Sequence, residues 1–128
     1  MTAPFGTTLT CPVQPAATAV SLNTVAFIAP RAGTVSAVNY TTVTADTRAV
    51  TLVNKGQAGA GAVTVATLQF DSGVNTVAAD EKTITLSGTP ANLVVAAGDV
   101  LQWQSAAIGT GLADPGGLAA VTIAANYA

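Results

Sequence analysis

The sequence predicts an all-β fold, and three observations carry that prediction. Short runs rich in Val, Ile and Thr alternate apolar and polar residues with the period of a strand. Clusters of Gly, Pro, Asp and Ser separate these runs at intervals of roughly ten residues, a spacing typical of sandwiches and barrels. No segment keeps a helical period, because Val, Thr and Gly interrupt the alanine-rich stretches. We therefore expect an antiparallel β-sandwich or barrel without a helix of ordinary length.

The first 20 residues are expected to form an extended N-terminal arm. Pro4, Pro12 and Pro15 each fix φ and lack a backbone N–H, which disfavours a helix or a central strand. Such an arm can lie along its own domain or along a neighbouring subunit. Phe5 has no strand pattern around it and is a candidate anchor in a pocket. We predict that the arm contacts a partner through its apolar residues, which are Pro4, Phe5, Leu9, Pro12 and Val13.

The remaining residues, 21–128, are expected to form a single β-sandwich domain. About eight strands are predicted in it, at 24–28, 33–42, 49–54, 62–70, 83–86, 92–95, 100–105 and 118–125. Within 100–105 the strand period places Leu101 and Trp103 on the core side, and Gln102 and Gln104 on the solvent side. Turn-forming residues lie between the strands, for example Gly98 followed by Asp99.

A glycine-rich run at 56–61 superficially resembles a phosphate-binding loop. Such a loop follows a strand and opens a helix, whose N-terminus holds the phosphate. Here the run leads into Val63-Thr64-Val65, which reads as another strand, and the Lys-Ser/Thr ending is absent. We predict a flexible hairpin loop.

The chain carries little charge. Only 8% of its 128 residues are Asp, Glu, Lys or Arg and 50% are hydrophobic, whereas an ordinary domain is about 25% charged. The hydrophobic residues are dispersed among Thr, Gly, Ser and Asn and form no membrane-spanning run. Because the cores of protein interfaces are depleted of charge, this composition favours a subunit whose surface is covered by other protein.

The few charges also argue against a nucleic-acid partner. The net charge is −2, and the basic residues Arg31, Arg48, Lys55 and Lys82 are scattered singly along the chain. The N-terminal segment has neither the basic region nor the continuous apolar region of a secretory signal. We therefore expect the protein to be made and assembled in the cytoplasm.

Most residues needed for catalysis and metal binding are missing. The sequence has no His and a single Cys, Cys11, which excludes Ser-His-Asp and Cys-His nucleophile systems and His-based zinc sites. Most Asp residues lie in or beside predicted turns, where Asp caps backbone groups. Asp80 and Glu81 alone fall far short of a calcium site. We expect no enzyme activity, no metal and no cofactor, and we expect Cys11 to be a packed apolar residue.

Three segments carry a resemblance to a known family. They are Phe27-Ile-Ala-Pro-Arg-Ala-Gly-Thr-Val35, Val95-Ala-Ala-Gly-Asp-Val-Leu101 and the closing hydrophobic strand at 118–125. With the Ala/Thr/Val strands between them, they resemble the small jelly-roll decoration (cement) proteins of tailed-bacteriophage heads. The resemblance extends over about residues 24–126. It implies a jelly-roll-like sandwich that binds the major capsid protein on the exterior of the virion as a homotrimer. The N-terminal arm would then reach neighbouring subunits or the shell.

A second interpretation stays open, because phage fibre and receptor-binding domains have similar strand and glycine patterns. In that case the protein would be a glycan-recognising β-sandwich module, with an aromatic side chain as the sugar-binding platform. Trp103 alternates with glutamines and is predicted to pack in the core instead. The sequence therefore favours capsid decoration as the function.

Overall fold

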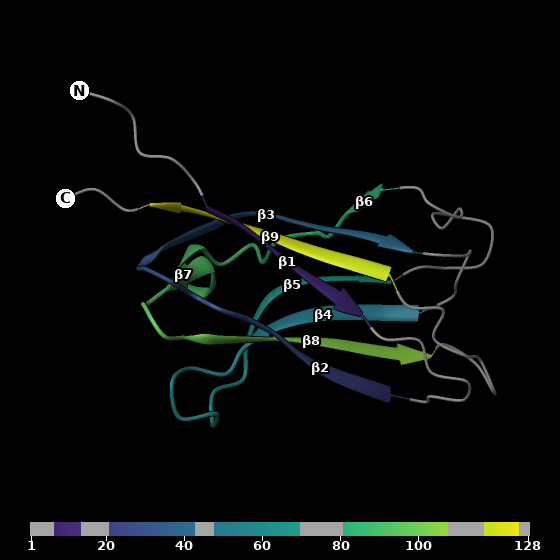
Figure 1. Ribbon diagram of the computed structural model, residues 1–128, viewed down its shortest axis with the longest axis horizontal. Helices are drawn as coiled ribbons and strands as arrows, with labels where there is room; N and C mark the ends of the chain where they lie inside the picture. The colour runs from purple at the N-terminus through teal and green to yellow at the C-terminus, as the bar shows by residue number, and fades with distance from the viewer. Residues whose placement is uncertain (1–6, 14–20, 43–47, 70–80, 108–116, 126–128) are drawn as a thin grey trace.

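The computed structural model describes residues 7–13, 21–42, 48–69, 81–107 and 117–125, and these form a sandwich of two antiparallel sheets (Figure 1). The first sheet has the order β1 (Thr7–Val13), β9 (Gly117–Ala125), β3 (Gly33–Thr42) and β6 (Glu81–Thr83). A short strand, β7 (Val94–Val95), also pairs with β3. The second sheet has the order β2 (Ser21–Ile28), β8 (Val100–Ala107), β4 (Arg48–Asn54) and β5 (Val63–Gln69).

The order of the strands is that of a jelly roll. The chain crosses from one sheet to the other after β1, β2, β3, β5, β7 and β8, whereas β4 and β5 form a hairpin within the second sheet. Because β6 and β7 pair with the same strand, β3, they act as one interrupted strand. The described residues thus form the eight-stranded, double-sheet arrangement expected for this fold. The predicted fold class is confirmed.

The core lies between the two sheets and follows the predicted alternation. Leu101 and Trp103 of β8 are fully buried, while Gln102 and Gln104 lie on the outer side and their amides hydrogen-bond to each other, at 2.9 Å from Nε2 to Oε1. The Trp103 ring packs against Tyr40 of β3, with ring centroids 5.1 Å apart. This pair joins the two sheets at the centre of the sandwich.

Most predicted strands match observed ones, and the strand predicted at 33–42 is confirmed to the residue as β3. The strand predicted at 92–95 is only partly correct. Pro90–Leu93 forms a short 3₁₀ helix, η1, and only Val94–Val95 pairs with β3. Pro90 explains the difference, because its fixed φ suits the first turn of a helix and it cannot donate to a strand ladder.

The strand predicted at 83–86 also differs, because this segment changes partner. β6 ends at Thr83, and Ile84 N then donates to Val38 O of β3 at 2.8 Å. Two residues later Leu86 forms an isolated bridge with Ala66 of β5. The segment therefore crosses from the first sheet to the second and belongs to neither as a regular strand.

The described part of the predicted arm lies along its own domain. Thr7–Val13 is extended, as its prolines indicate, and forms the edge strand β1 beside β9. The rest of the arm, at 1–6 and 14–20, lies outside the described residues.

Candidate interaction surface

The predicted contact residues fall into two groups. Leu9, Pro12 and Val13 lie together on β1, whereas Pro4 and Phe5 lie outside the described residues. Pro12 is exposed on the outer side of the strand. Leu9 is half-buried and packs against the core of its own sandwich, a structural role that the sequence did not reveal.

β1 pairs with β9 over its whole length. The register runs from Thr7 opposite Ile123 to Val13 opposite Gly117 without a shift. The side chains alternate, with Leu9 toward the core and the exposed Thr8 and Thr10 on the outer side. The hydroxyls of Thr8 and Thr122 lie 3.1 Å apart and form a hydrogen bond across the two strands.

On β1, β9 and β3, the outer face of the first sheet is formed by uncharged side chains, most of them small. On β9 they are Leu118, Ala120, Thr122 and Ala124, and on β3 they are Thr34, Ser36, Ala37, Asn39 and Thr41. Thr8, Thr10 and Pro12 extend this face across β1. No Asp, Glu, Lys or Arg is among the described side chains of these three strands. We call this surface of β1, β9 and β3 the Ala/Thr face; its described side chains lack the charge that normally opposes close protein contact.

One end of the sandwich is built from loops that bond to one another. Asp99 Oδ2 accepts from Asn54 Nδ2 at 3.1 Å and from Ala96 N at 2.8 Å. Ala29 N donates to Asp99 O at 2.9 Å, and Gly98 N donates to Ala29 O at 2.8 Å. Asp99 thus ties the β2–β3 and β7–β8 connections to each other and to the end of β4. For Asp99 the predicted role in a turn is confirmed; Asp46, Asp71, Asp80 and Asp114 are outside the described residues.

The glycine-rich run after β4 is the predicted hairpin loop. Gly56 and Gly59 have φ values of 68° and 78°, a region that L-residues rarely adopt. Asn54 Oδ1 accepts from Gly56 N at 2.8 Å and closes the first turn. The chain then enters β5 rather than a helix, so the phosphate-loop geometry is absent from this hairpin.

Cys11 has the predicted character of a packed residue. It is half-buried against the core, and burial raises the pKa of its thiol from 9.0. Its Sγ–H is directed at Pro12 O at 3.5 Å. A nucleophilic cysteine needs the opposite shift, toward the thiolate.

The described aromatic side chains are buried and offer no face to a sugar. Trp103 is 0% exposed, Tyr40 2% and Phe27 4%. The core prediction for Trp103 is therefore confirmed. The other aromatic residues, Phe5, Phe70 and Tyr127, lie outside the described residues.

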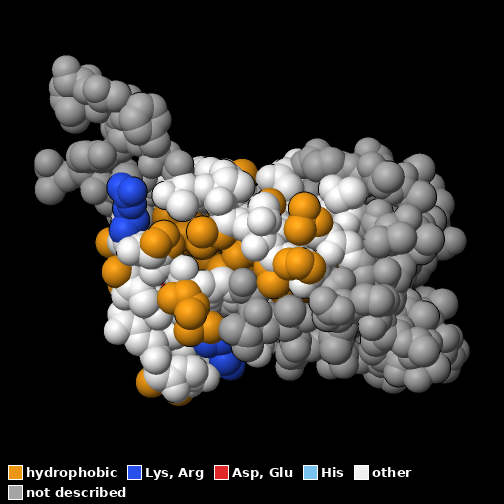
Figure 2. Space-filling model, in the orientation of Figure 1, with side chains coloured by type: hydrophobic (Ala, Val, Ile, Leu, Met, Phe, Trp, Pro, Cys, Tyr) orange, Lys and Arg blue, Asp and Glu red, His pale blue; other side chains and the backbone are white. Residues whose placement is uncertain are grey.

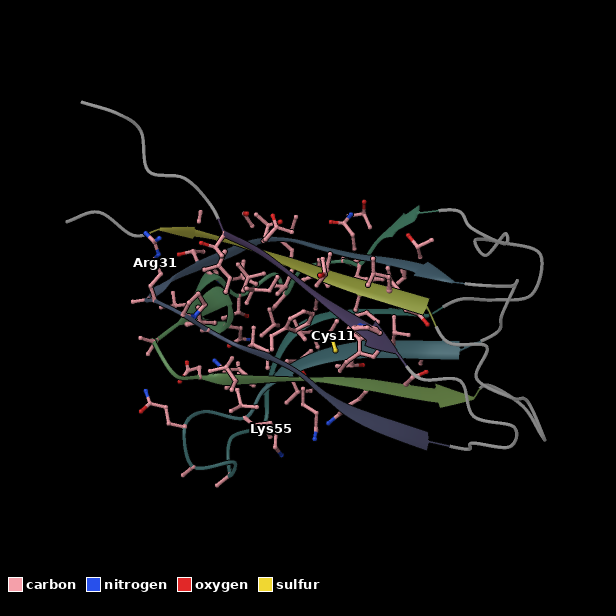
Figure 3. All side chains as sticks on the ribbon, viewed as in Figure 1. Cys11, Arg31 and Lys55 are labelled. Carbon is pink, nitrogen blue, oxygen red and sulfur yellow. The ribbon has the colours of Figure 1, made fainter. Side chains whose placement is uncertain are left out.

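The two basic side chains that the structure describes do not form a patch. Arg31 lies in the β2–β3 connection and Lys55 follows β4, and Figure 3 shows them at separate places. Among the described residues no group of three or more His, Cys, Asp or Glu side chains could hold a metal ion. In the same residues no helix has the length and hydropathy needed to cross a membrane.

Comparison with known proteins identifies no family. No family model matches the chain, and no curated protein matches it. Among solved structures, the chain is similar to a chain in the structure of infectious bursal disease virus, Gx strain, at 15% sequence identity and a TM-score of 0.38. The similarity covers 96% of this chain and 32% of that chain, so this chain spans about a third of the length of its match.

Proposed function

We propose that this protein is a structural component of a virion that decorates and stabilises a phage capsid. It would bind as an oligomer to the major capsid protein on the outer shell, after assembly in the host cytoplasm. The Ala/Thr face is the observation that carries the proposal. The family resemblance of the sequence supports the same function.

The Ala/Thr face suits docking onto another protein for two physical reasons. Small side chains let a partner approach the sheet closely, and the absence of charge avoids the large cost of burying an unpaired ion. The hydroxyls of Thr8 and Thr122 already bond to each other, which leaves only the O–H of the accepting hydroxyl to be paired when a neighbour covers them.

Stabilisation of the shell would follow from mass action. A protein that binds the assembled capsid but not its dissociated subunits favours assembly by its binding free energy at every occupied site. Many copies on one shell multiply the effect. No catalytic group is needed for this function.

The experiment uses purified capsids that lack the protein. Saturation with the wild-type protein should raise the temperature at which the capsids rupture and release their genome. An unchanged rupture temperature in the presence of excess protein, or no binding detected by co-sedimentation, would contradict the proposal.

A pair of matched variants tests the face itself. Ala120→Lys places a charge at the centre of the Ala/Thr face, between Thr10 and Asn39 in the register. Ala58→Lys makes the same change of charge in the exposed β4–β5 turn. The first should weaken capsid binding at least about tenfold, because a buried unpaired charge costs more than 1.4 kcal/mol. The second should bind as the wild type does, and equal binding by both variants would exclude the Ala/Thr face as the contact.

A further inference from the structure

Three of the four edge strands of this sandwich carry features that prevent pairing with another chain. β6 is only three residues long and its sequence includes Glu81 and Lys82. β5 is covered over part of its length, because Thr67 N donates to Thr85 O at 2.9 Å and Ser87 N donates to Val65 O at 2.8 Å. β2 has a bulge between Val25 and Phe27. Short length, charge, cover and bulges are the devices by which natural sheets avoid edge-to-edge association.

β1 is the fourth edge and has none of these four features. It has seven residues, none charged, and an unbroken register with β9. No strand among the described residues pairs with its other edge. In Figure 1, β1 crosses in front of β9, and Figure 2 shows hydrophobic side chains gathered over the middle of the same side. Its one protective feature is Pro12, near its C-terminal end.

The hydrogen bonds show which backbone groups of β1 face outward. Ser36 Oγ of β3 donates to Thr122 O at 3.3 Å, so the Thr122 carbonyl points toward β3 and away from β1. In an antiparallel pair, two opposed residues direct their N–H and C=O groups either toward each other or both away. Thr8 lies opposite Thr122, so its N–H and C=O point to the free edge.

The strand period extends this direction to Thr10 and Pro12. Pro12 fits the outward direction, because proline has no N–H to donate to β9 and is tolerated where its nitrogen faces a free edge. The free edge of β1 therefore offers the N–H and C=O of Thr8 and Thr10, and only the C=O of Pro12.

We propose that β1 is a self-association edge, through which a second copy of this chain pairs antiparallel about a two-fold axis. An axis through Leu9 places Thr8 opposite Thr10 of the second copy, so that four N–H···O bonds form and Pro12 stays outside them. The two first sheets then join into one continuous sheet. In a two-fold contact a strand lies opposite a copy of itself, so charged residues near the axis would face like charges and repel. β1 has no charged residue.

The same geometry favours a pair of copies over the trimer that the family resemblance implies. A three-fold ring joins two different surfaces of each subunit, whereas a two-fold pair uses one surface twice. β2, the other edge strand beside β1, is bulged and therefore a poorer partner. This inference goes beyond the capsid function and does not depend on it.

Sedimentation velocity of the full chain with two variants tests the proposal. The wild type should form a concentration-dependent dimer. Thr10→Pro removes the outward N–H in both copies, two of the four bonds, and should raise the dimer dissociation constant by about 30-fold or more. Thr10→Val keeps the N–H and should remain a dimer. A monomeric or trimeric wild type, or a Thr10→Pro variant that still dimerises as the wild type does, would overturn the proposal.

Disulfide cross-linking tests the register. In a Cys11→Ser background, Thr8→Cys mixed with Thr10→Cys should form a heterodimer on oxidation, because directly opposed residues lie within disulfide distance. Either variant alone should cross-link far less, because its two cysteines are offset along the strands. If either variant alone cross-linked as much as the mixture of the two, the result would contradict an axis at Leu9. Sedimentation of the Ala120→Lys variant separates this proposal from the decoration function. Ala120 lies on β9, between β1 and β3, and not at the free edge of β1, so this variant should dimerise as the wild type does even where it fails to bind the capsid.

Discussion

The two lateral sides of the sandwich are closed in different ways. On the β5/β6 side, a single segment bonds first to β3, through Ile84 N and Val38 O at 2.8 Å, and then to β5, through Ser87 N and Val65 O at 2.8 Å. On the other side β1 and β2 lie near each other but belong to different sheets. No crossing segment joins them among the described residues. One side is thus sealed by the chain itself, while the other presents a regular edge, β1, that a second copy can complete.

Burial follows the same division. Ile84, on the closed side, is 0% exposed, whereas Leu9 and Cys11 on the open side are only half-buried against the core. Edge strands bury less, because solvent reaches them from one direction. The difference indicates that the closed side contributes more to the stability of the single chain. The proposed pairing of β1 with a second copy would bury the open side further.

Ile84→Ala should have the largest effect. Removing a fully buried Ile side chain costs about 2–5 kcal/mol, the sum of the lost transfer free energy and the cavity left behind. Urea unfolding followed by Trp103 fluorescence measures this cost. Thr85→Ala, at the exposed neighbouring position, is the control and should change the free energy of unfolding by about 0.5 kcal/mol or less. A small effect of Ile84→Ala would mean that the crossing segment does not seal the core.

The same proline substitution on both sides should give unequal results. Ser87→Pro removes the N–H that bonds to Val65 O and should cost about 1–3 kcal/mol. Ser87→Ala controls for the hydroxyl, which accepts from Thr89 N and Asn92 Nδ2. Thr10→Pro, on the free edge, should cost the monomer less than about 1 kcal/mol. Equal losses in the two proline variants, measured by urea unfolding at low protein concentration, would contradict the contrast between the sides.

Leu9→Ala should have an intermediate effect. Since the side chain is half-buried, about 1–2 kcal/mol is expected, roughly half the cost at a fully buried site. The measurement is best made in the Thr10→Pro background, so that dimerisation does not contribute. A loss as large as that of Ile84→Ala would show that the open side is as important to the single chain as the closed one.

The alternation of apolar and polar residues was sufficient to predict the strands whose two faces differ in polarity. Alternation alone located β3 and the inward direction of Leu101 and Trp103, because one face of each strand must be buried. It failed at 83–86, where the partner of the segment changes from β3 to β5. Such a change of partner depends on the tertiary fold and produces no alternating pattern in the sequence.

For the candidate contact residues, too, the sequence did not show which strands would lie side by side. Pro12 argued against a central strand, and β1 is indeed an edge strand, but proline cannot indicate which strand lies beside it. The contact of Leu9 with its own core depends on the pairing of β1 with β9, which joins the two ends of the described chain. The Ala/Thr face likewise arises from three strands far apart in sequence, and only the register brings their small residues together.

The smallest expected effect is a pH dependence of stability that arises from Cys11, on the open side of the sandwich. Because burial raises the pKa of its thiol above 9.0, the folded state favours the neutral form. The resulting contribution to stability is complete below the pKa of the unfolded state and is lost as the pH rises through the higher folded value. The urea midpoint of the wild type should therefore fall more steeply above about pH 9 than that of Cys11→Ala, while the two profiles run parallel from pH 6 to 8. Parallel profiles over the whole range would mean that the thiol is as open to solvent in the fold as in the unfolded chain, and that β1 does not pack against the core at this position.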